Sequence, residues 1–485
     1  MAISVESFFL SPEAEGTLQA QIQQMIAQGI LSGRFRKGEK LPSSRRMAGH
    51  LGVSRITVTL AYTELQANDY LESRDRSGYF VSQNAPEPPA FTPSAAKGDL
   101  IDWGRAIGRR YTGGATPEKP RDWSSYPYPF IFGQTDPSLF DHASWRHCAL
   151  RALGQKEFQA LAADAYDQDD PKLIEFIARH TLPRRGILAE PGEILLTMGA
   201  QNALWLTAQV LLTQRRTAAV EEPCYHALRD ILTQSRCHMA PVPVDRDGLR
   251  PDALPERADV IFTTPSHQAP TNATMPLDRR QDLLARAREM EALIVEDDYE
   301  FEISFLRAPL PSLKSLDTDG RVIYVGSFSK SIFPGLRLGY LVGPQAFIRE
   351  ARALRASVLR HPPGHVQRTT AYFLSLGHYD SLIRRIGKAY ARRRQVMETA
   401  LEDHGLGVEG RGVFGGSSIW MRAPEGVDTE DLAERLRARG VLIEPGRPFF
   451  EAASAPRNFY RLAYSSIPSE RIADGIGILA NELGS

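Results

Sequence analysis

The stretch that decides the fold of most of this chain is Gly326-Ser-Phe-Ser-Lys-Ser-Ile-Phe-Pro-Gly-Leu-Arg-Leu-Gly-Tyr340. It follows the apolar run Val322–Val325, which predicts a buried strand, and it places Lys330 seven residues before Arg337. Desolvation near an apolar core lowers the pKa of a lysine and leaves a neutral amine that can form a Schiff base. The Ser327 hydroxyl and the Arg337 guanidinium suit a phosphate group. Taken alone, the stretch also fits an ordinary charged loop.

Similar apolar runs recur on both sides of this stretch and end in small, polar or acidic residues. The clearest are Glu193–Thr197, Val260–Thr264, Leu293–Glu296 and Tyr340–Val342. Helical patterns such as Asp278–Ala292 separate some of them. Strands that alternate with helices predict an α/β fold with a mostly parallel central sheet. In such a sheet, ligands bind at the carboxyl ends of the strands.

Polar residues at the ends of these runs suit a phosphorylated heteroaromatic ring. Asp297 can keep a pyridine nitrogen protonated, and Tyr299 can bond a hydroxyl of the ring. The Gly199–Gln201 turn opens a helix whose backbone N–H groups can hold a phosphate. Tyr225 can stack on the ring. Each feature has an ordinary alternative: a cation site or helix cap, a common strand–helix turn, and a half-buried tyrosine.

Together these segments resemble the fold-type I pyridoxal-phosphate enzymes of the aspartate aminotransferase superfamily, from about residue 126 to the C-terminus. The resemblance implies pyridoxal 5'-phosphate (PLP) as the cofactor. By position, Lys330 would form the Schiff base, Asp297 would face the pyridine nitrogen and Tyr299 would bond the ring oxygen O3′. The further cofactor-binding residues implied are Gly199, Ala200, Gln201, Tyr225, Ser327 and Arg337.

The same resemblance implies two features of the assembly and of the ligand site. Tyr166 would reach the phosphate bound in the opposite subunit, which implies a homodimer. Arg461 falls where the superfamily binds the carboxylate of its substrate, so it would bind the acidic group of an effector. A smaller C-terminal α+β subdomain, roughly 346–485, would close over the ligand.

Residues 1–82 predict a separate small module. Apolar residues between Leu18 and Ile30 have helical spacing, and Ser43 and Ser54 can cap two further helices. Two short strand-like runs follow, joined by the turn-forming residues 75–78. Three helices followed by a hairpin predict a winged helix-turn-helix.

Positive charge in this module is concentrated around the second and third helices. Residues 34–62 contain seven Lys or Arg and one Glu, although the whole chain balances 58 basic against 58 acidic residues. A basic helix-turn-helix suits DNA phosphates, with the third helix in the major groove. Arg55 could reach a guanine edge, while Ser43, Thr57 and Thr59 suit phosphate contacts. The alternative is a protein–protein module with a solvated basic face.

Three motifs in the module resemble the GntR family of winged-helix regulators: Gly33–Arg45, Leu51–Val58 and Ser77–Val81. The resemblance implies binding to double-stranded DNA. The residues that it places against DNA are Arg45, Ser54, Arg55 and Thr57, with Ser77 and Gly78 at the tip of the wing.

A Pro-rich stretch at 86–93 predicts an exposed linker, because it cannot form a helix or a central strand. We therefore expect a DNA-binding domain at 1–82, a linker at 83–125 and a PLP- and effector-binding domain at 126–485. This order resembles the MocR (GabR-like) transcriptional regulators, and it implies a head-to-tail, domain-swapped homodimer.

Composition excludes several other classes of protein. The 485 residues contain three cysteines and no CxxC pair, so neither a disulfide framework nor a structural metal site is expected. No apolar stretch is long enough to span a membrane, and the N-terminus lacks the basic start of a signal peptide. The sequence therefore predicts a cytoplasmic protein.

The resemblance implies a PLP-dependent regulator of transcription that senses a small amine through an external aldimine at Lys330. Taurine, another ω-amino acid or an amino acid derivative would fit. GABA is disfavoured, because Ala227 occupies the position of an arginine in the GABA-responsive pattern. Two alternatives remain. One is a sensor of PLP itself that controls vitamin B6 synthesis; the other is an active aminotransferase, since the residues for a first half-reaction are present.

Overall fold

This computed structural model describes residues 2–10, 16–75, 77–87, 101–112, 119–451 and 455–484. The chain divides into two compact units, Met1–Arg110 and Tyr111–Ser485. Most of the Pro-rich stretch that predicts the linker, residues 88–93, lies outside the described residues. The segment from residue 119 to 125, at the end of the expected linker, belongs to the second unit.

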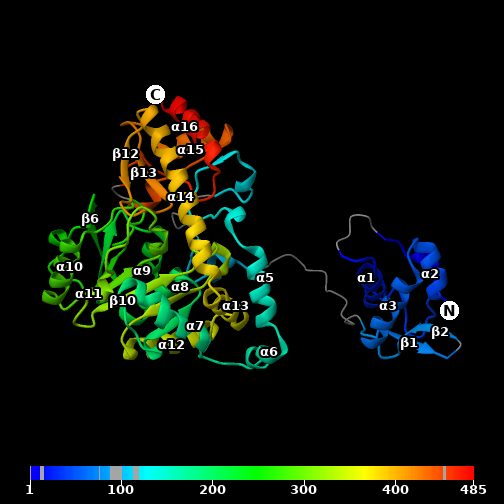
Figure 1. The fold of residues 1–485 in the computed structure, drawn as a ribbon. Helices are drawn as coiled ribbons and strands as arrows, with labels where there is room; N and C mark the ends of the chain where they lie inside the picture. The colour runs from blue at the N-terminus through cyan, green and yellow to red at the C-terminus, as the bar shows by residue number, and fades with distance from the viewer. Residues whose placement is uncertain are drawn as a thin grey trace. The chain divides into compact units, whose positions relative to one another are not determined.

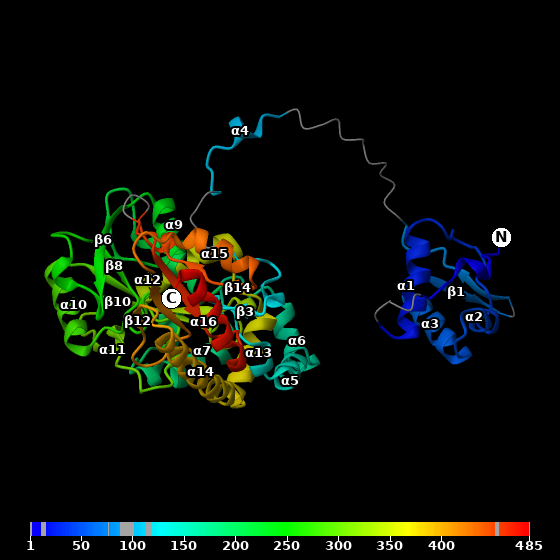
Figure 2. The same cartoon turned by 90° about the horizontal axis from the view of Figure 1, so that it is seen from above.

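Within the first unit, residues 18–81 form three α-helices and a two-stranded wing (Figures 1 and 2). Thr17, Ser43 and Ser54 each precede a helix, and each hydroxyl accepts a hydrogen bond from a backbone N–H three residues later. Buried apolar side chains from the three helices form one core. The elements are η1 (Val5–Ser7), α1 (Leu18–Leu31), α2 (Ser44–Leu51), α3 (Arg55–Ala67), β1 (Leu71–Arg74) and β2 (Gly78–Val81). The predicted winged helix is confirmed.

The second unit is built on an eight-stranded sheet, counted within the described residues. Its strands, in spatial order, are β4 (Ile194–Thr197), β11 (Gly339–Val342), β10 (Val322–Ser327), β9 (Leu293–Asp297), β8 (Val260–Thr263), β5 (Thr217–Glu222), β6 (His238–Asp245) and β7 (Gly248–Leu249). All run parallel except β11 and β7. The predicted, mostly parallel sheet is confirmed.

Helices cover both faces of this sheet. Neighbouring strand residues fall into different cores: Val295 and Ile323 pack in one cluster, whereas Ile294 and Val322 pack in another. This alternation follows from the two-residue period of a strand, and it explains why the strands read as continuous apolar runs. One face packs against α8 (Ala200–Leu211), α9 (His226–Ser235) and α12 (Gln345–Leu359), and the other against α10 (Leu277–Glu289) and α11 (Leu313–Leu316).

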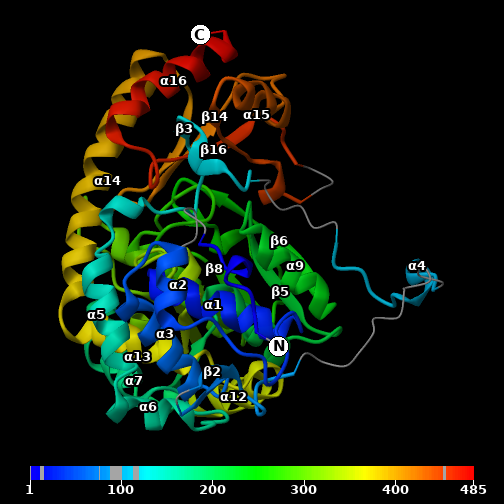
Figure 3. The ribbon, with the colours of Figure 1, turned by 90° about the vertical axis from the view of Figure 1, so that its right-hand side faces the viewer.

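A smaller α+β part contains the C-terminus. Its four-stranded sheet has the order β12 (Val408–Arg411), β13 (Ser418–Arg422), β16 (Phe459–Ala463) and β15 (Glu444–Pro445). Its helices are α15 (Thr429–Ala438), α16 (Ser469–Leu483) and the C-terminal part of α14 (His378–Asp403). The long α14 runs from the region of α13 to the small sheet and packs against α16 (Figure 3). A short parallel pair joins β14 (Val441–Leu442) to β3 (Tyr128–Pro129).

The remaining helices surround these sheets. They are α5 (His142–Ala152), α6 (Gln155–Ala162), α7 (Pro171–Phe176) with the helical turns η4 (Ile177–Thr181) and η5 (Leu182–Arg185), and α13 (Gly364–Ser375), whereas α4 (Trp103–Ala106) belongs to the first unit. Among the described helices, none is long and apolar enough to cross a membrane. The described residues also contain no cluster of three or more His, Cys, Asp or Glu side chains that could hold a metal ion.

Candidate functional site

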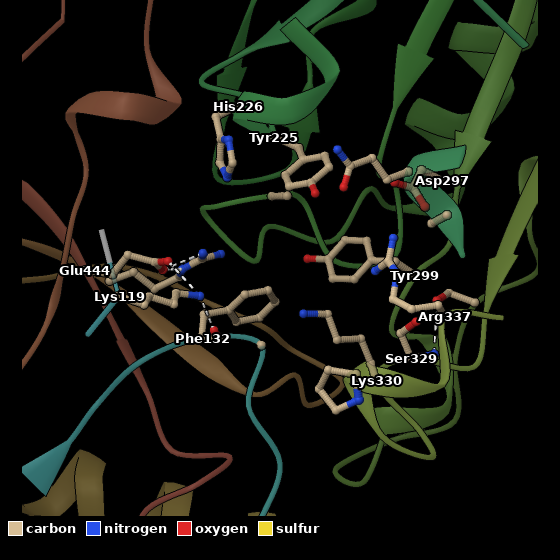
Figure 4. Close-up of a pocket in the computed structure, with 17 residues that line it drawn as sticks. Lys119, Phe132, Tyr225, His226, Asp297, Tyr299, Ser329, Lys330, Arg337 and Glu444 are labelled. Carbon is tan, nitrogen blue, oxygen red and sulfur yellow. Dashed lines mark hydrogen bonds and ion pairs between the residues drawn. The ribbon is translucent and has the colours of Figure 1, made fainter. Parts of the chain in front are cut away.

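A cavity of about 260 Å³ lies at the carboxyl ends of β9 and β10, the edge where a parallel sheet binds its ligands (Figure 4). Residues from both sheets and from the segment 119–133 line it. The lining residues are Lys119, Phe132, Gly133, Ala200, Gln201, Tyr225, His226, Ala269, Asp297, Tyr299, Ser327, Ser329, Lys330, Pro334, Arg337, Glu444 and Arg461.

Asp297 is the last residue of β9, and its carboxyl group faces the cavity. Burial, together with the neighbouring carboxylates Asp298 and Glu221, raises the pKa of Asp297 to about 8. Its Oδ1 atom has no hydrogen-bond partner among the described residues. Asp298 is bound on the other side of the strand, where its Oδ2 accepts hydrogen bonds from Arg185 Nε at 2.7 Å and from Tyr324 at 2.9 Å. A buried acid with a free oxygen suits a cationic N–H donor, whereas Asp298 has a structural role.

Lys330 follows β10 and is half-buried, with Nζ 3.9 Å from the ring centroid of Phe132. Burial lowers the pKa of Lys330 to about 8. The Glu300 carboxylate opposes this shift, whereas the positive charges of Lys119 and Arg461 add to it. The Lys330 amine therefore loses its proton much more easily than an exposed lysine, as a nucleophilic amine requires.

A cup of backbone and hydroxyl groups lies next to Lys330. Gly199, just before α8, has φ +81°, a left-handed conformation that favours glycine. An ideal Cβ built on Gly199 would lie 3.6 Å from both Arg337 Cζ and Ser329 Oγ. Arg337 Nη2 donates to the Met198 carbonyl at 3.3 Å, and the buried Ser329 Oγ has no partner among the described residues. A helix N-terminus, a guanidinium and a free hydroxyl suit a phosphate.

The rings of Tyr225 and Tyr299 both point into the cavity (Figure 4). Burial raises the pKa of both phenols, and the charge of Asp297 raises the pKa of Tyr225 while Glu300 raises that of Tyr299. Both therefore stay neutral and can donate a hydrogen bond. His226 is neutral for a related reason, because burial lowers its pKa to about 4.

These groups together fit the expected cofactor. The free Asp297 oxygen suits a protonated ring nitrogen, the neutral Tyr299 suits a ring oxygen, and the cup around Arg337 suits the phosphate. The side chain of Lys330 points into the same cavity (Figure 4).

Arg461 lies on the far side of the cavity, in β16 of the small sheet. Its Nε and Nη2 donate to the same oxygen of Glu444, Oε2, at 2.6 and 2.5 Å. The other oxygen, Oε1, lies 3.3 Å from Lys119 Nζ. Burial alone would raise the pKa of Glu444, but these two cations bring it below its usual value. Arg461 thus lines the ligand cavity, but its guanidinium is paired with the buried carboxylate of Glu444.

Most of the predicted ligand-site residues meet in this cavity, and Tyr166 does not. Tyr166 is exposed, and its ring lies 5.5 Å from the guanidinium carbon of Arg360. Its role in an opposite subunit stays a prediction. No local pattern in the sequence points to four further lining residues: Lys119, Phe132, His226 and Glu444. A fifth, Ser329, has such a signal, since it lies inside the Gly326–Tyr340 stretch.

The predicted DNA-contacting side chains lie on the first unit at α2, at α3 and at the wing. Arg55, the first residue of α3, is exposed, and its Nε donates to Ser44 Oγ of α2 at 3.4 Å. Ser54 Oγ accepts from the Thr57 backbone N–H at 3.1 Å, and Thr59 Oγ1 donates to the Arg55 carbonyl at 2.9 Å. The further predicted residues Ser43, Arg45, Ser77 and Gly78 are all exposed.

Two protein families match separate parts of the chain. The family described as "Aminotransferase class I and II" matches residues 143–478. The family described as "Bacterial regulatory proteins, gntR family" matches residues 18–81. The match to the first family covers more than half of the chain.

Individual relatives show the same combination. The chain is 59% identical over 483 residues to the "HTH-type transcriptional regulator TauR" of Rhodobacter capsulatus, and the match covers 100% of both chains. It is 29% identical over 478 residues to the "Probable rhizopine catabolism regulatory protein MocR" of Rhizobium meliloti, covering 97% of this chain and 94% of the relative.

Among solved structures, the chain resembles LysN, an α-aminoadipate aminotransferase of Thermus thermophilus complexed with N-(5'-phosphopyridoxyl)-L-leucine. The TM-score is 0.71 at 29% identity, covering 79% of this chain and 98% of that chain. With a gntR winged helix and an aminotransferase class I and II domain in one polypeptide, the chain belongs to the MocR-like transcriptional regulators.

Proposed function

We propose that this regulator binds PLP in the cavity at Lys330 and uses it to sense a small amine in the cytoplasm. The observation that carries the proposal is that Asp297, Lys330 and the cup around Arg337 line one cavity. Asp297 has a free oxygen for the ring nitrogen, Lys330 has an amine that loses its proton easily, and the cup has a free hydroxyl and a guanidinium for the phosphate. The winged helix of the same chain would bind the operator.

Different residues would hold different parts of the cofactor. Asp297 would hold the ring nitrogen, Tyr299 the ring oxygen and Tyr225 one face of the ring. Ser327, Ser329 and Arg337 would hold the phosphate, with the backbone of Gly199, Ala200 and Gln201. When bound, PLP supplies an aldehyde carbon at which an incoming amine can replace the amine of Lys330.

Taurine is the effector that we propose first, because the chain is 59% identical to TauR along its whole length. Its amine would replace that of Lys330, and its acidic group would lie near Arg461. Binding would favour closure of the small C-terminal part, and closure would change the relative placement of two winged helices in a head-to-tail homodimer. Such a signal requires that taurine bind one of the two states more tightly.

The test is an absorption titration of purified, PLP-loaded protein with taurine, GABA and other amines. We expect taurine to shift the visible band of the cofactor and the shifted band to persist, whereas GABA acts only at higher concentration. A Lys330→Ala variant should lose the native band, and an unchanged band would overturn the role of Lys330.

The same titration separates the alternatives. A band that bleaches with the amine and returns when an oxo acid is added would mean turnover as an aminotransferase. If no amine shifts the band, while adding PLP to the cofactor-free protein changes its affinity for DNA, PLP itself is the signal.

A further inference from the structure

Lys119 is a second cation beside Arg461, and it comes from an unexpected part of the chain. It lies in the segment that sequence analysis assigns to the linker, nine residues after the first unit ends at Arg110. Its ammonium donates to the carbonyl of Phe132 and lies 3.3 Å from Glu444 Oε1. Lys119, in the described segment that starts at residue 119, is thus attached to a wall of the ligand cavity.

The Lys119 ammonium is close to the amine of Lys330. An ideal Cβ built on Gly133 would lie 3.0 Å from Lys330 Nζ and 3.8 Å from Lys119 Nζ. The two ammonium nitrogens are therefore no farther apart than the sum of these two distances. The ring of Phe132 lies between them in Figure 4, and its centroid is 3.9 Å from both Lys330 Nζ and Arg461 Cζ. A compact molecule with an amine at one end and an anion at the other matches this spacing. Taurine is such a molecule, with roughly 4 Å between nitrogen and sulfur by ordinary bond lengths.

The three charged side chains at this end of the cavity sum to one net positive charge, which one bound anion would neutralise. Arg461 and Lys119 carry two positive charges, and Glu444 supplies one negative charge. Glu444 Oε2 accepts both bonds from Arg461, whereas Lys119 makes one longer ion pair. Lys119 is also the more exposed cation, since its side chain is 30% exposed against 6% for Arg461. An entering anion therefore meets a lysine that is more exposed than the arginine and lies farther from Glu444.

We propose that Lys119, together with Arg461, binds the acidic group of the effector, and that this contact ties effector binding to the segment that leads to the DNA-binding unit. The inference rests on the proposed function, because it assumes that an amine effector enters this cavity. With a second anionic partner, Lys119 would be held more firmly, and residues 119–125 would open less often.

The test compares two ligands that differ only at one end. Taurine carries a sulfonate and 2-aminoethanol carries a hydroxyl, while both present the same primary amine. Absorption titrations of PLP-loaded, full-length protein give the dissociation constant of 2-aminoethanol divided by that of taurine. In Lys119→Gln we expect this ratio to fall about tenfold, as loss of one charge-assisted bond implies. Lys156→Gln, at an exposed lysine of α6, is the matched control and should keep the wild-type ratio.

Limited trypsin digestion supplies a second readout that does not depend on the cofactor spectrum. Arg109, Arg110 and Arg121 are exposed on either side of Lys119, and trypsin cleaves poorly at the Lys119–Pro120 bond. Lys119→Gln therefore leaves the cleavage sites unchanged. We expect taurine to slow cleavage after Arg121 in wild type and in Lys156→Gln, but not in Lys119→Gln, because proteolysis requires local opening.

The outcomes distinguish this inference from the proposed function. If neither these two ligands nor any other amine shifts the band of the wild-type protein, the proposed function fails and the inference fails with it. If taurine shifts the band but the ratio and the cleavage rates are equal in wild type and Lys119→Gln, the inference alone is overturned. Lys119→Arg keeps the charge and should retain a ratio close to that of wild type; a ratio as low as that of Lys119→Gln would also overturn it.

Discussion

Glu444 of β15 and Arg461 of β16 stand directly opposite each other in an antiparallel pair, and the carboxylate accepts two hydrogen bonds from the guanidinium. Both side chains are almost completely buried. A buried ion pair adds little net stability by itself, but removal of one partner leaves an uncompensated charge in the interior.

The first prediction follows from this pair. Glu444→Ala should destabilise the second unit by about 3–5 kcal/mol, because Arg461 loses its buried counter-charge. The double variant Glu444→Leu/Arg461→Met should recover most of this loss. Urea denaturation followed by tryptophan fluorescence measures both. Equal stability of the single and double variants would contradict the prediction.

The second prediction concerns Asp297 and pH. Its pKa is about 8 in the folded protein and 3.8 for an ordinary aspartate, so the folded state holds a proton that the unfolded state releases between these values. The wild-type protein without cofactor therefore loses stability as pH rises from about 4 to 8. Asp297→Asn does not titrate, so its stability relative to wild type should increase across this range.

Thermal melts of both cofactor-free proteins at pH 5.5 and pH 8 measure this difference. The same variant should bind PLP more weakly, because a neutral amide cannot pair with a protonated ring nitrogen. A difference in melting temperature that does not change with pH would show that Asp297 is ionised throughout.

The third prediction tests the close backbone approach under the phosphate cup. Gly339 pairs with Thr197 of β4 and with Ser327 of β10, and a Cβ at Gly339 would lie 2.8 Å from the Gly326 carbonyl oxygen and 3.0 Å from Gly199 Cα. Since backbone atoms cannot rotate away, Gly339→Ala should cost about 1–3 kcal/mol.

The affinity for PLP should fall in Gly339→Ala, because the Gly199 turn would have to move. Gly335→Ala is the matched control, since among the described residues the only atom within 4 Å of its Cβ is a Phe333 ring carbon at 3.9 Å. Fluorescence titration of cofactor-free protein with PLP compares the two variants. Equal affinities would show that the cup does not hold the phosphate.

The fourth prediction concerns DNA. Arg55→Ala should weaken binding to a selected operator by about 1–3 kcal/mol, and the loss should be smaller on unrelated DNA if Arg55 reads a base. The measurement is a filter-binding or anisotropy titration, with an operator obtained by selection from random DNA with the wild-type protein. Arg215→Ala, an exposed arginine of the second unit, is the control. A uniform loss on all sequences would instead assign Arg55 to a phosphate.

Local signals explain what the sequence predicts well. The strands that end at the cavity are apolar runs; Asp297 ends one of them, Lys330 comes shortly after the next, and Arg337 lies two residues before β11. Glu444 could not be found in this way, because only the antiparallel register of β15 and β16 brings it to Arg461. Lys119 lies in a stretch without periodicity, next to a Pro-rich segment, so composition alone places it in a linker. Both depend on contacts between distant parts of the chain, which no local pattern records.

The two sheets line different ends of the cavity: the large sheet carries the residues proposed to hold PLP, and the small sheet carries the anion end. The side chains proposed to hold PLP lie at or after the ends of β5, β9 and β10 or precede β11, whereas Arg461 and Glu444 belong to the small sheet. Movement of the small sheet can therefore open the anion end while the ring and phosphate contacts stay in place. A sensor built in this way can release one effector molecule and accept the next without having to capture a new cofactor each time.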